Sequence, residues 1–589
     1  MVYVPTTYQI PPLSCHYYAS SSYICTVKEL WSIIPQSYRR RAIGVAATIF
    51  LRALLNFVGV AMLIPVLTLI LDGDSFTSNE YLCNIYSWLD VNSFESFAVI
   101  VCVAVVAVIL IKNIAILGLY RWERNYIYAL YRHLSKALFI SYHRRGFGFV
   151  KQQNSAVLTR NVNVVSLMFV AGVLKPIATI IGEVLLLTLI FAALLWYSPL
   201  AALLAVGLFL PIVAIFYLAL RRKLHDIGER ENVAQRTKSR VVAECFRGYA
   251  DVEIGGAFPY MFKRFEAAMD EVVSLRKRNA TIGMLPQMFT EVGLAVGLVA
   301  LVMLSVLNHS DNVALMFGIF AVAAIRLIPS VRGIMSSWST IRYNRYAIDT
   351  LADIDVADDD SVVENGERMT FERNIELRNV DFRFDDADSN TINDLSLTIN
   401  KGERLGIRGS SGVGKTTLFN LILGLYRPTN GEILVDGVRL SDDNIRSWQN
   451  AIGYVSQSVF IADMTLAENI AFGCDVKDID YERVNKVIEL ANLKEFVASL
   501  SDGVNSRIGE QGSRISGGQR QRIGIARALY KGCDVLFFDE ATSSLDDRTE
   551  ENINNAIRRL STDNRSLTIV VIAHRDSSLE YCDRIITLR

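Results

Sequence analysis

The stretch that decides the fold of the C-terminal half is Gly406–Leu425, which reads GIRGSSGVGKTTLFNLILGL. It starts as the end of a short strand, continues as a glycine-rich loop, and from Leu418 onward has the apolar spacing of a helix. Glycines let backbone N–H groups converge on a phosphate, and the start of a helix adds partial positive charge. We therefore predict a nucleotide-phosphate site made of Gly409, Ser410, Ser411, Gly412, Val413, Gly414, Lys415, Thr416 and Thr417.

A second motif supports a nucleotide ligand. The spacing of the loop predicts that Lys415 reaches the β- and γ-phosphates and that Thr416 binds Mg²⁺. Further along, Val535–Glu540 reads VLFFDE, four residues of a buried strand that ends in two carboxylates. Asp539 suits the Mg²⁺ shell, and Glu540 suits a base that polarises the attacking water. The two motifs together predict ATP hydrolysis with Mg²⁺.

Composition points to a membrane protein. The chain has 589 residues, of which 51% are hydrophobic and 20% are charged, a balance that leans toward a membrane protein rather than a soluble one. Its net charge of +0 gives no electrostatic support for a nucleic-acid partner. The eight cysteines are scattered without a C-x-x-C pair, so neither a disulfide framework nor a zinc site is indicated.

Apolar runs in the N-terminal half predict six membrane-spanning helices. Each run exceeds the roughly 20 residues that cross the hydrocarbon core, and two runs are long enough to be divided. The divisions fall at a Tyr-Ser-Pro break and at a short polar segment. The spans lie at 43–71, at 97–120, on either side of Tyr197–Pro199 within 169–220, and on either side of 308–312 within 282–331.

The charges between these spans set the expected orientation. Lys28 and Arg39–Arg41 precede the first span, whereas residues 72–96 contain acidic residues and no Lys or Arg. Segments 121–168 and 219–281 are rich in both basic residues. Basic loops stay on the cytoplasmic side, so both termini and the phosphate-binding half are expected in the cytoplasm, next to the inner membrane. The two inner segments are long enough for helices that continue well beyond the bilayer.

A third motif carries a family resemblance. Ile515–Arg522 reads ISGGQRQR, and it resembles the signature of ABC transporters, with Ile where Leu is usual. Residues 370–589 resemble the nucleotide-binding domain of that family throughout. In the family, the signature faces the γ-phosphate of the ATP that the other subunit holds. The resemblance assigns this role to Ser516, Gly517, Gly518 and Gln519.

The same resemblance assigns the remaining site residues. Gln457 matches the glutamine that contacts Mg²⁺ and senses the membrane domain, and His574 matches the switch histidine on the γ-phosphate. With Glu540, His574 would form the catalytic pair. Phe384 stands where a tyrosine commonly stacks on adenine, and a phenylalanine can still stack there. Residues 543–546 resemble the family's D-loop.

The resemblance also implies the architecture. A membrane domain fused ahead of the ATPase resembles the exporters, so we expect a polytopic α-helical membrane domain with six transmembrane helices and long cytoplasmic extensions, followed by an α/β P-loop NTPase domain of the ABC type. An intact Glu540 and His574 argue against a protein that only gates or regulates. Each ATP would lie between two subunits, which favours a homodimer, with a heterodimer as the alternative. The expected domains are a tail and elbow at 1–42, the membrane domain at 43–345, a linker at 346–370 and the nucleotide-binding domain at 371–589.

The substrate is indicated by fewer residues. Tyr81–Leu89 has the spacing of an amphipathic helix at the outer interface, which resembles the lipid-linked oligosaccharide flippases. Arg52 and Arg326 lie inside spans and could line a cationic path for a pyrophosphate, or form internal ion pairs with Glu183 or Glu291. We expect an exporter that flips a polyprenyl-pyrophosphate oligosaccharide. A multidrug, lipid or peptide exporter is the alternative.

Overall fold

The structure is a computed structural model. In it the chain forms two compact units. One consists of Met1–Arg145 and Phe149–Asp360, and the other of Gly146–Gly148 and Ser361–Arg589. The described residues are those outside 1–26, 64–65, 67–93, 198, 308–312, 353–366, 386, 510–514, 541–549, 552–553, 556–557, 559–565, 574, 576–578 and 589.

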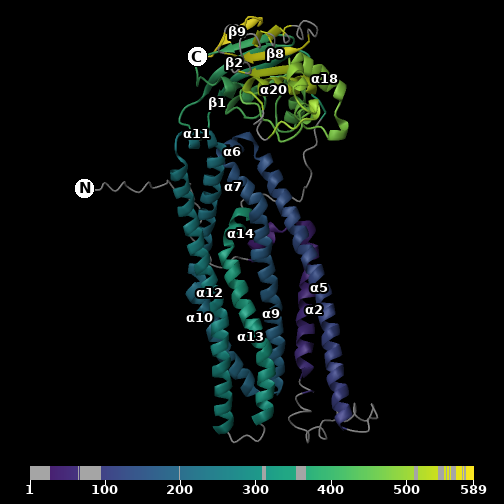
Figure 1. Cartoon of the computed structure of the whole chain (residues 1–589), viewed down its shortest axis with the longest axis vertical. Coiled ribbons are helices and arrows are strands. Elements are labelled where there is room, and N and C mark those ends of the chain that lie inside the picture. Colours follow the sequence, from purple (N-terminus) through teal and green to yellow (C-terminus); the bar gives the residue numbers. More distant parts are fainter. Residues whose placement is uncertain are drawn as a thin grey trace, which may run out of the picture. The chain divides into compact units, whose positions relative to one another are not determined.

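The first unit is helical (Figure 1). Its long helices are α2 (Gln36–Ala61), α5 (Phe94–Arg144), α9 (Lys175–Tyr197), α10 (Pro199–Arg247), α12 (Phe258–Leu307) and α13 (Val313–Tyr343). The shorter helices are α1 (Val27–Ile33), α7 (Ser155–Arg160), α8 (Ser166–Phe169), α11 (Tyr249–Ile254) and α14 (Arg345–Ala352). Helix α6 (Gly146–Gln152) is divided between the two units after Gly148.

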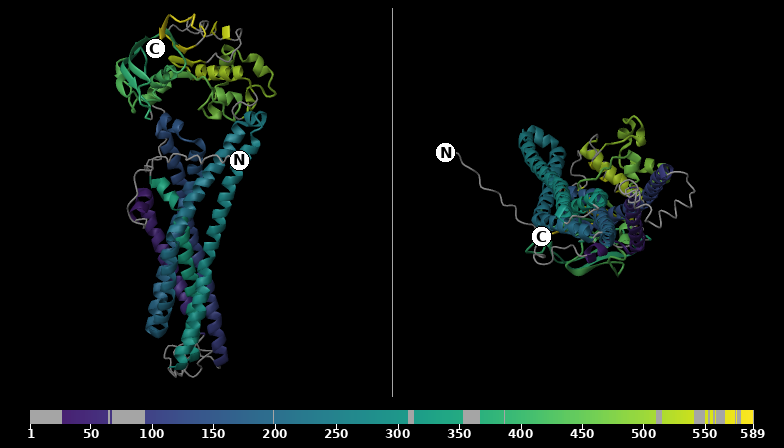
Figure 2. Two further views of the ribbon diagram at one scale, coloured as in Figure 1. Left: turned by 90° about the vertical axis from the view of Figure 1, so that its left-hand side faces the viewer. Right: turned by 90° about the horizontal axis from the view of Figure 1, so that it is seen from below.

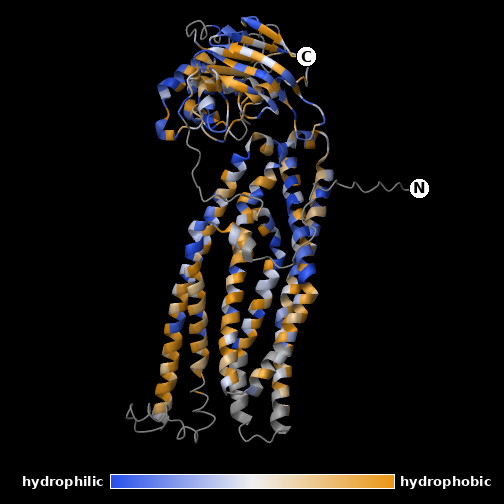
Figure 3. Cartoon of the chain, turned by 180° about the vertical axis from the view of Figure 1, so that it is seen from behind, coloured by the Kyte–Doolittle hydropathy of each residue, from blue (hydrophilic) through white to orange (hydrophobic). Residues whose placement is uncertain are grey.

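Helices α5, α10 and α12 each have an apolar part and a more polar part, whereas α9 is apolar along most of its length (Figure 3). In the described part of the chain, four helical stretches are long and apolar enough to cross a membrane: Gln36–Ala61, Ser96–Arg144, Ser155–Trp196 and Phe258–Ala300. Helices α10 and α13 occupy the other two predicted spans, for which spanning stays a prediction. The predicted break falls where α9 ends at Tyr197 and α10 begins at Pro199, since proline is favoured in the first turn of a helix.

The long polar segments continue the membrane helices, as expected from their length. Helix α5 runs without a break to Arg144, and α10 runs to Arg247. Helices α10 and α12 lie side by side over much of their length (Figures 1 and 2). Helix α10 also touches the end of α13, where a Cβ atom on Gly228 would lie 2.0 Å from the Tyr343 carbonyl oxygen. Only glycine fits at this approach.

The helix that leads into α9 contains two π-helical segments. They are η2 (Asn161–Val165), between α7 and α8, and η3 (Val170–Leu174), between α8 and α9. Each π-helical turn holds more residues than an α-helical turn and changes which side chains face a neighbouring helix. Val165 and Val173 are buried there, in one cluster with Leu130 and Leu134 of α5.

Helix α14 lies at the start of the segment for which a linker is predicted. Its Ala347, Ile348 and Leu351 are buried in the same apolar cluster as Val165 and Val173. The sequence did not predict this short apolar stripe, because the residues that follow it are acidic.

The second unit contains two sheets. The antiparallel sheet has the order β2-β1-β4-β5, and the parallel sheet has the order β6-β7-β8-β3-β9. Both share their core with α15 (Lys415–Ile422), whose Phe419 packs edge-on against Phe537 with 5.2 Å between ring centroids. The strands are β1 (Asn374–Phe382), β2 (Ile392–Asn400), β3 (Arg404–Arg408), β4 (Asn430–Val435), β5 (Val438–Arg439), β6 (Ile452–Val455), β7 (Val535–Asp539), β8 (Thr568–Ile572) and β9 (Arg584–Thr587).

The remaining helices of this unit surround the sheets. They are α16 (Ile445–Ala451), α17 (Leu466–Ile470), α18 (Tyr481–Leu490), α19 (Lys494–Ala498) and α20 (Gly517–Lys531), with the 3₁₀ turns η4 (Val476–Asp478) and η5 (Gly503–Asn505).

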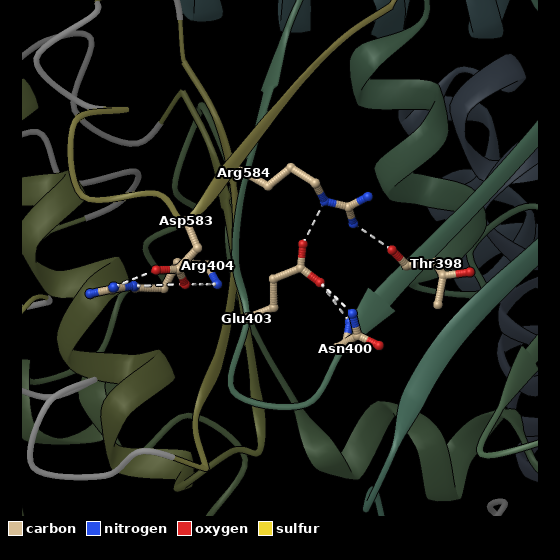
Figure 4. A network of polar contacts seen from close by, with 6 residues as sticks. All are labelled: Thr398, Asn400, Glu403, Arg404, Asp583 and Arg584. Carbon is tan, nitrogen blue, oxygen red and sulfur yellow. Dashed lines mark hydrogen bonds and ion pairs between the residues drawn. The ribbon is translucent and has the colours of Figure 1, made fainter.

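A polar network joins the last strand to the centre of the unit (Figure 4). Arg584 donates to a Glu403 carboxylate oxygen at 2.7 Å, and the other oxygen of Glu403 accepts the Asn400 backbone N–H at 2.8 Å. Arg404 donates two side-chain bonds to Asp583, at 2.6 and 3.1 Å. The parallel pairing of β9 with β3 is thus fixed by side chains at its start.

Candidate nucleotide site

Parallel pairing brings the predicted site residues to one edge of the sheet. Strands β6, β7, β8 and β3 are neighbours and run in the same direction. Their carboxyl ends lead to Gln457, to Asp539 and Glu540, to residue 574, and to the glycine loop. Ligands of such sheets bind outside the carboxyl ends of the strands. His574 and residues 543–546 lie outside the described residues, so their roles stay predictions.

The glycine loop has the backbone that phosphate binding requires. Gly412 and Gly414 have φ angles of 85° and 101°, values that residues with a Cβ atom rarely adopt. Lys415 begins α15, is buried, and donates from Nζ to the carbonyl oxygens of Gly409 at 2.8 Å and Ser410 at 3.1 Å. The ammonium is therefore held over its own loop, where a phosphate oxygen can compete for the same donors.

The predicted Mg²⁺ ligands lie next to one another. Thr416 Oγ1 donates to Asp539 Oδ1 at 3.4 Å. Burial raises the pKa of Asp539, and the hydrogen bond from Thr416 opposes that rise. A hydroxyl and a carboxylate are hard oxygen donors that fit Mg²⁺, which usually takes few protein ligands and shares its shell with substrate phosphates. The described residues contain no group of three or more His, Cys, Asp or Glu side chains that could hold a metal ion.

Glu540 is held by the residue that the resemblance places beside the metal. Gln457 Nε2 donates to Glu540 Oε2 at 2.7 Å. The Glu540 backbone has a φ of 49°, and its N–H donates to the Ile572 oxygen at 3.0 Å. A left-handed backbone is uncommon for glutamate and costs conformational energy, which the bond to β8 offsets. In this backbone conformation the Glu540 carboxylate accepts the hydrogen bond from Gln457.

The signature residues form the start of α20. Ser516 is the N-cap: its Oγ accepts the Gln519 N–H at 3.2 Å, and Gln519 Oε1 accepts the Ser516 N–H at 2.8 Å. This capping box fixes the loop and leaves the Ser516 hydroxyl proton to be donated. Gly517 and Gly518 provide the first backbone N–H groups of the helix, which suit an anion.

Phe384 belongs to an aromatic cluster. Its ring meets Phe382 edge-on with 4.9 Å between centroids and Tyr426 edge-on with 5.6 Å. The ring is only half-buried, so stacking on an adenine stays a prediction for this side chain. The other predicted members, Ser411, Val413 and Thr417, lie in the loop or in the first turn of α15.

The two membrane-domain arginines both have acidic partners. Arg52 Nη1 donates to Glu123 Oε2 at 2.6 Å, and the two residues are 9% and 5% exposed. Arg326 lies 4.0 Å from Glu183, which also accepts the Ser330 hydroxyl at 2.6 Å. Of the two acids expected for an ion pair, Glu183 is therefore the one near Arg326, while Glu291 accepts from Gln287.

Two contributors were not predicted. Tyr454, three residues before Gln457, hydrogen-bonds Asp539 through its hydroxyl, and burial together with that carboxylate raises the pKa of Tyr454. Its place near the end of a strand beside β7 could have indicated it. Glu123 could have been found from the rule that an arginine within an apolar helix needs an acid.

Comparisons with known proteins show which family the chain resembles. The family model described as ABC transporter matches residues 392–543. The chain is 30% identical over 444 residues to the ATP-dependent lipid A-core flippase of Ralstonia nicotianae, covering 74% of each chain. It is 32% identical over 412 residues to the protein of the same name from Cupriavidus pinatubonensis, covering 67% of each chain.

A solved structure extends the likeness to the whole fold. A bacterial Atm1-family ABC exporter with ATP bound superposes with a TM-score of 0.76 at 22% identity, covering 94% of this chain and 93% of that chain. The likeness includes the helical unit as well as the unit with the glycine loop. The chain thus belongs to the ABC transporter family, as an integral membrane, exporter-type half-transporter whose second domain hydrolyses ATP.

Proposed function

We propose that two copies of this chain form an inner-membrane flippase that uses ATP and Mg²⁺ to move an anionic, sugar-bearing lipid to the outer leaflet. A polyprenyl-pyrophosphate oligosaccharide is the specific candidate. The observation that carries the proposal is the likeness, over two thirds or more of their length, to proteins named ATP-dependent lipid A-core flippases. Both termini and the ATPase domains would lie in the cytoplasm.

The geometry of the nucleotide site supports a division of roles. Lys415 and the glycine loop would hold the phosphates, and Thr416 and Asp539 would hold Mg²⁺, which neutralises phosphate charge when bound. Glu540 would accept a proton from the attacking water, with its carboxylate oriented by Gln457. The capped start of α20 would present Ser516 and two glycine N–H groups to the ATP of the other copy.

The charges of the membrane domain support an anionic head group. Arg326 is half-buried, and its Nε has no hydrogen-bond partner among the described residues. Its guanidinium is 4.0 Å from the Glu183 carboxylate, too far for a direct hydrogen bond. A phosphate oxygen could therefore bind this guanidinium without first breaking a close ion pair.

The test is flipping in proteoliposomes that contain the purified full chain. Separate arms carry a labelled polyprenyl-pyrophosphate glycan, a labelled lipid A-core lipid, a labelled peptide and a fluorescent drug. We expect ATP-dependent movement of the first or second lipid only. Movement of the peptide or the drug alone would reject the proposal, and the two lipid arms decide between the candidates.

Two variants connect the test to the sequence. Arg326→Leu should reduce flipping far more than ATP hydrolysis, because the residue lies outside the nucleotide site. Arg332→Leu, on an exposed position of the same helix, is the matched control and should flip at the parent rate. Deletion of residues 80–89, which lie outside the described residues, should impair flipping if they form the expected outer helix. Parent rates in both test variants would remove the support for a cationic path.

A further inference from the structure

A polar pocket of about 690 Å³ lies within the helical unit, away from the predicted spans. Its walls come from α7, the first π-helical segment, α8 and α14, and from the polar parts of α10, α12 and α13. The volume falls in the range of small-molecule sites, roughly 300 to 1,000 Å³. No function assigned above uses it.

The pocket has an excess of positive charge. Its lining includes three arginines, Arg160, Arg247 and Arg276, and a single acid, Glu231. Arg276 Nε donates to Glu231 Oε1 at 2.8 Å, and Arg247 Nη2 donates to Ser155 Oγ at 3.0 Å. Glu231 also interacts electrostatically with Arg160, so one carboxylate is shared by two guanidinium groups and the lining keeps an excess of positive charge. Such a charge distribution favours a phosphate.

Buried polar atoms of the lining are not satisfied by the described residues. Arg160 Nη1 is a buried donor without a hydrogen-bond partner, and its guanidinium lies over the Tyr346 ring at 5.8 Å from the centroid. Glu231 Oε2 and Asn232 Oδ1 are buried acceptors without a partner, on residues only 6% and 7% exposed. Because buried polar groups nearly always form hydrogen bonds, these three atoms point to a ligand.

The unsatisfied atoms define the chemistry of that ligand. Arg160 requires an acceptor, and the excess positive charge requires an anion. Glu231 and Asn232 require donors, which a phosphate dianion lacks and which sugar hydroxyl or amide groups provide. A sugar that carries a phosphate has both parts in one molecule of suitable size.

We propose that this pocket binds a glycosyl phosphate, with the phosphate at Arg160 and Arg247 and the sugar at Glu231 and Asn232. The ligand can be the head group of the transported lipid, in which case the site deepens the proposed function and rests on it, or a free sugar phosphate. The polar segments around the pocket are those that the charge pattern assigns to the cytoplasmic side, where either source is accessible.

The test is a calorimetric titration of the purified full chain in nanodiscs, without nucleotide, using N-acetylglucosamine 1-phosphate as the probe. We expect saturable binding, with N-acetylglucosamine alone and inorganic phosphate alone each at least tenfold weaker. Arg160→Gln and Glu231→Gln should each weaken binding at least tenfold. Arg247→Gln, at an exposed position, should weaken it too and keeps the test valid if a buried variant misfolds.

Glu271→Gln is the matched control. Glu271 accepts from Arg230 at 2.6 Å and so links α10 to α12, as Glu231 and Arg276 do, but it does not line the pocket. Its variant should bind the probe as the parent does. The proposal is overturned if the parent does not bind the probe, if phosphate alone binds equally well, or if folded pocket variants bind with unchanged affinity.

A competition arm identifies the source of the ligand. If the probe inhibits flipping of the labelled polyprenyl-pyrophosphate glycan, the site takes the lipid head group. If the probe binds through these residues and flipping is unaffected, the site takes a free sugar phosphate. If the chain flips neither lipid but binds the probe through Arg160 and Glu231, the flippase proposal fails and the site stands.

Discussion

The ion pair of Arg52 and Glu123 allows the structural and the substrate-path interpretations of Arg52 to be separated. The pair is buried, with side chains 10% and 7% exposed, and Arg52 also lies 4.6 Å from the centroid of the Tyr120 ring. Removing one partner of a buried pair costs about 3 to 5 kcal/mol, because the other charge stays buried and unpaired. The Tyr120 ring still stabilises the cation in Glu123→Gln, so we expect the lower end, about 3 kcal/mol.

Replacing both partners should behave differently. Arg52→Met/Glu123→Leu leaves no unpaired charge, so its stability should be within about 1 kcal/mol of the parent or higher. The assay is thermal unfolding of the parent, Arg52→Met, Glu123→Leu, Glu123→Gln and the double variant in one detergent, followed by flipping of the labelled glycolipid. The reasoning is refuted if Glu123→Gln unfolds at the parent temperature, or if the double variant is no more stable than either single one. A stable double variant that flips at the parent rate would make Arg52 purely structural.

Three further predictions concern the ATPase domain. Glu540→Gln should bind ATP like the parent and lose steady-state hydrolysis by at least about 100-fold, within the contribution of a general base; unchanged turnover would refute the assignment. Homodimers of Ser516→Arg and of Lys415→Ala should both be inactive in an ATPase assay, since each damages both composite sites, and full activity in either would reject the shared-site arrangement. Asp583→Asn should lower stability at neutral pH by at most about 1 kcal/mol, because the partly exposed pair with Arg404 is screened by solvent. The hydrogen bond from Arg404 lowers the pKa of Asp583, so the parent should have the higher free energy of unfolding above about pH 4 and lose this difference as the pH falls further. Urea unfolding of both proteins at several pH values measures the difference. A difference in unfolding free energy that persists in acid would contradict the prediction.

Local motifs were predictable where a short sequence fixes both conformation and chemistry. The predicted strand that ends in Asp539 is β7, and the strand before the glycine loop is β3. A chain in which strands and helices alternate is typical of a parallel sheet. In such a sheet the carboxyl ends of β3, β6 and β7 lie at the same edge. The strained backbone of Glu540 was not predictable, since no local pattern demands a left-handed glutamate.

Ion pairs between residues that are far apart in the sequence were harder to predict. The arginines at positions 52 and 326 stand out in an apolar sequence, but their partners lie 71 and 143 residues away on other helices. Which acid meets which arginine depends on helix rotation, and apolar membrane helices have little periodicity that would fix it. The polar pocket could not be predicted either, because the residues that line it come from helices that are far apart in the sequence.

The two π-helical segments before α9 have a consequence for comparing this chain with its relatives. A π-helical turn commonly arises when one residue is inserted into an α-helix without changing the faces on either side. A relative that lacks one residue within Asn161–Val165 and another within Val170–Leu174 would therefore keep the same contacts before and after each segment. An alignment without gaps would instead displace the positions of α8 by one residue, a rotation of roughly 100° around the helix axis, and the positions of α9 by two residues. Alignments of this helix should allow a single-residue gap in each segment and no gap in α8 between them.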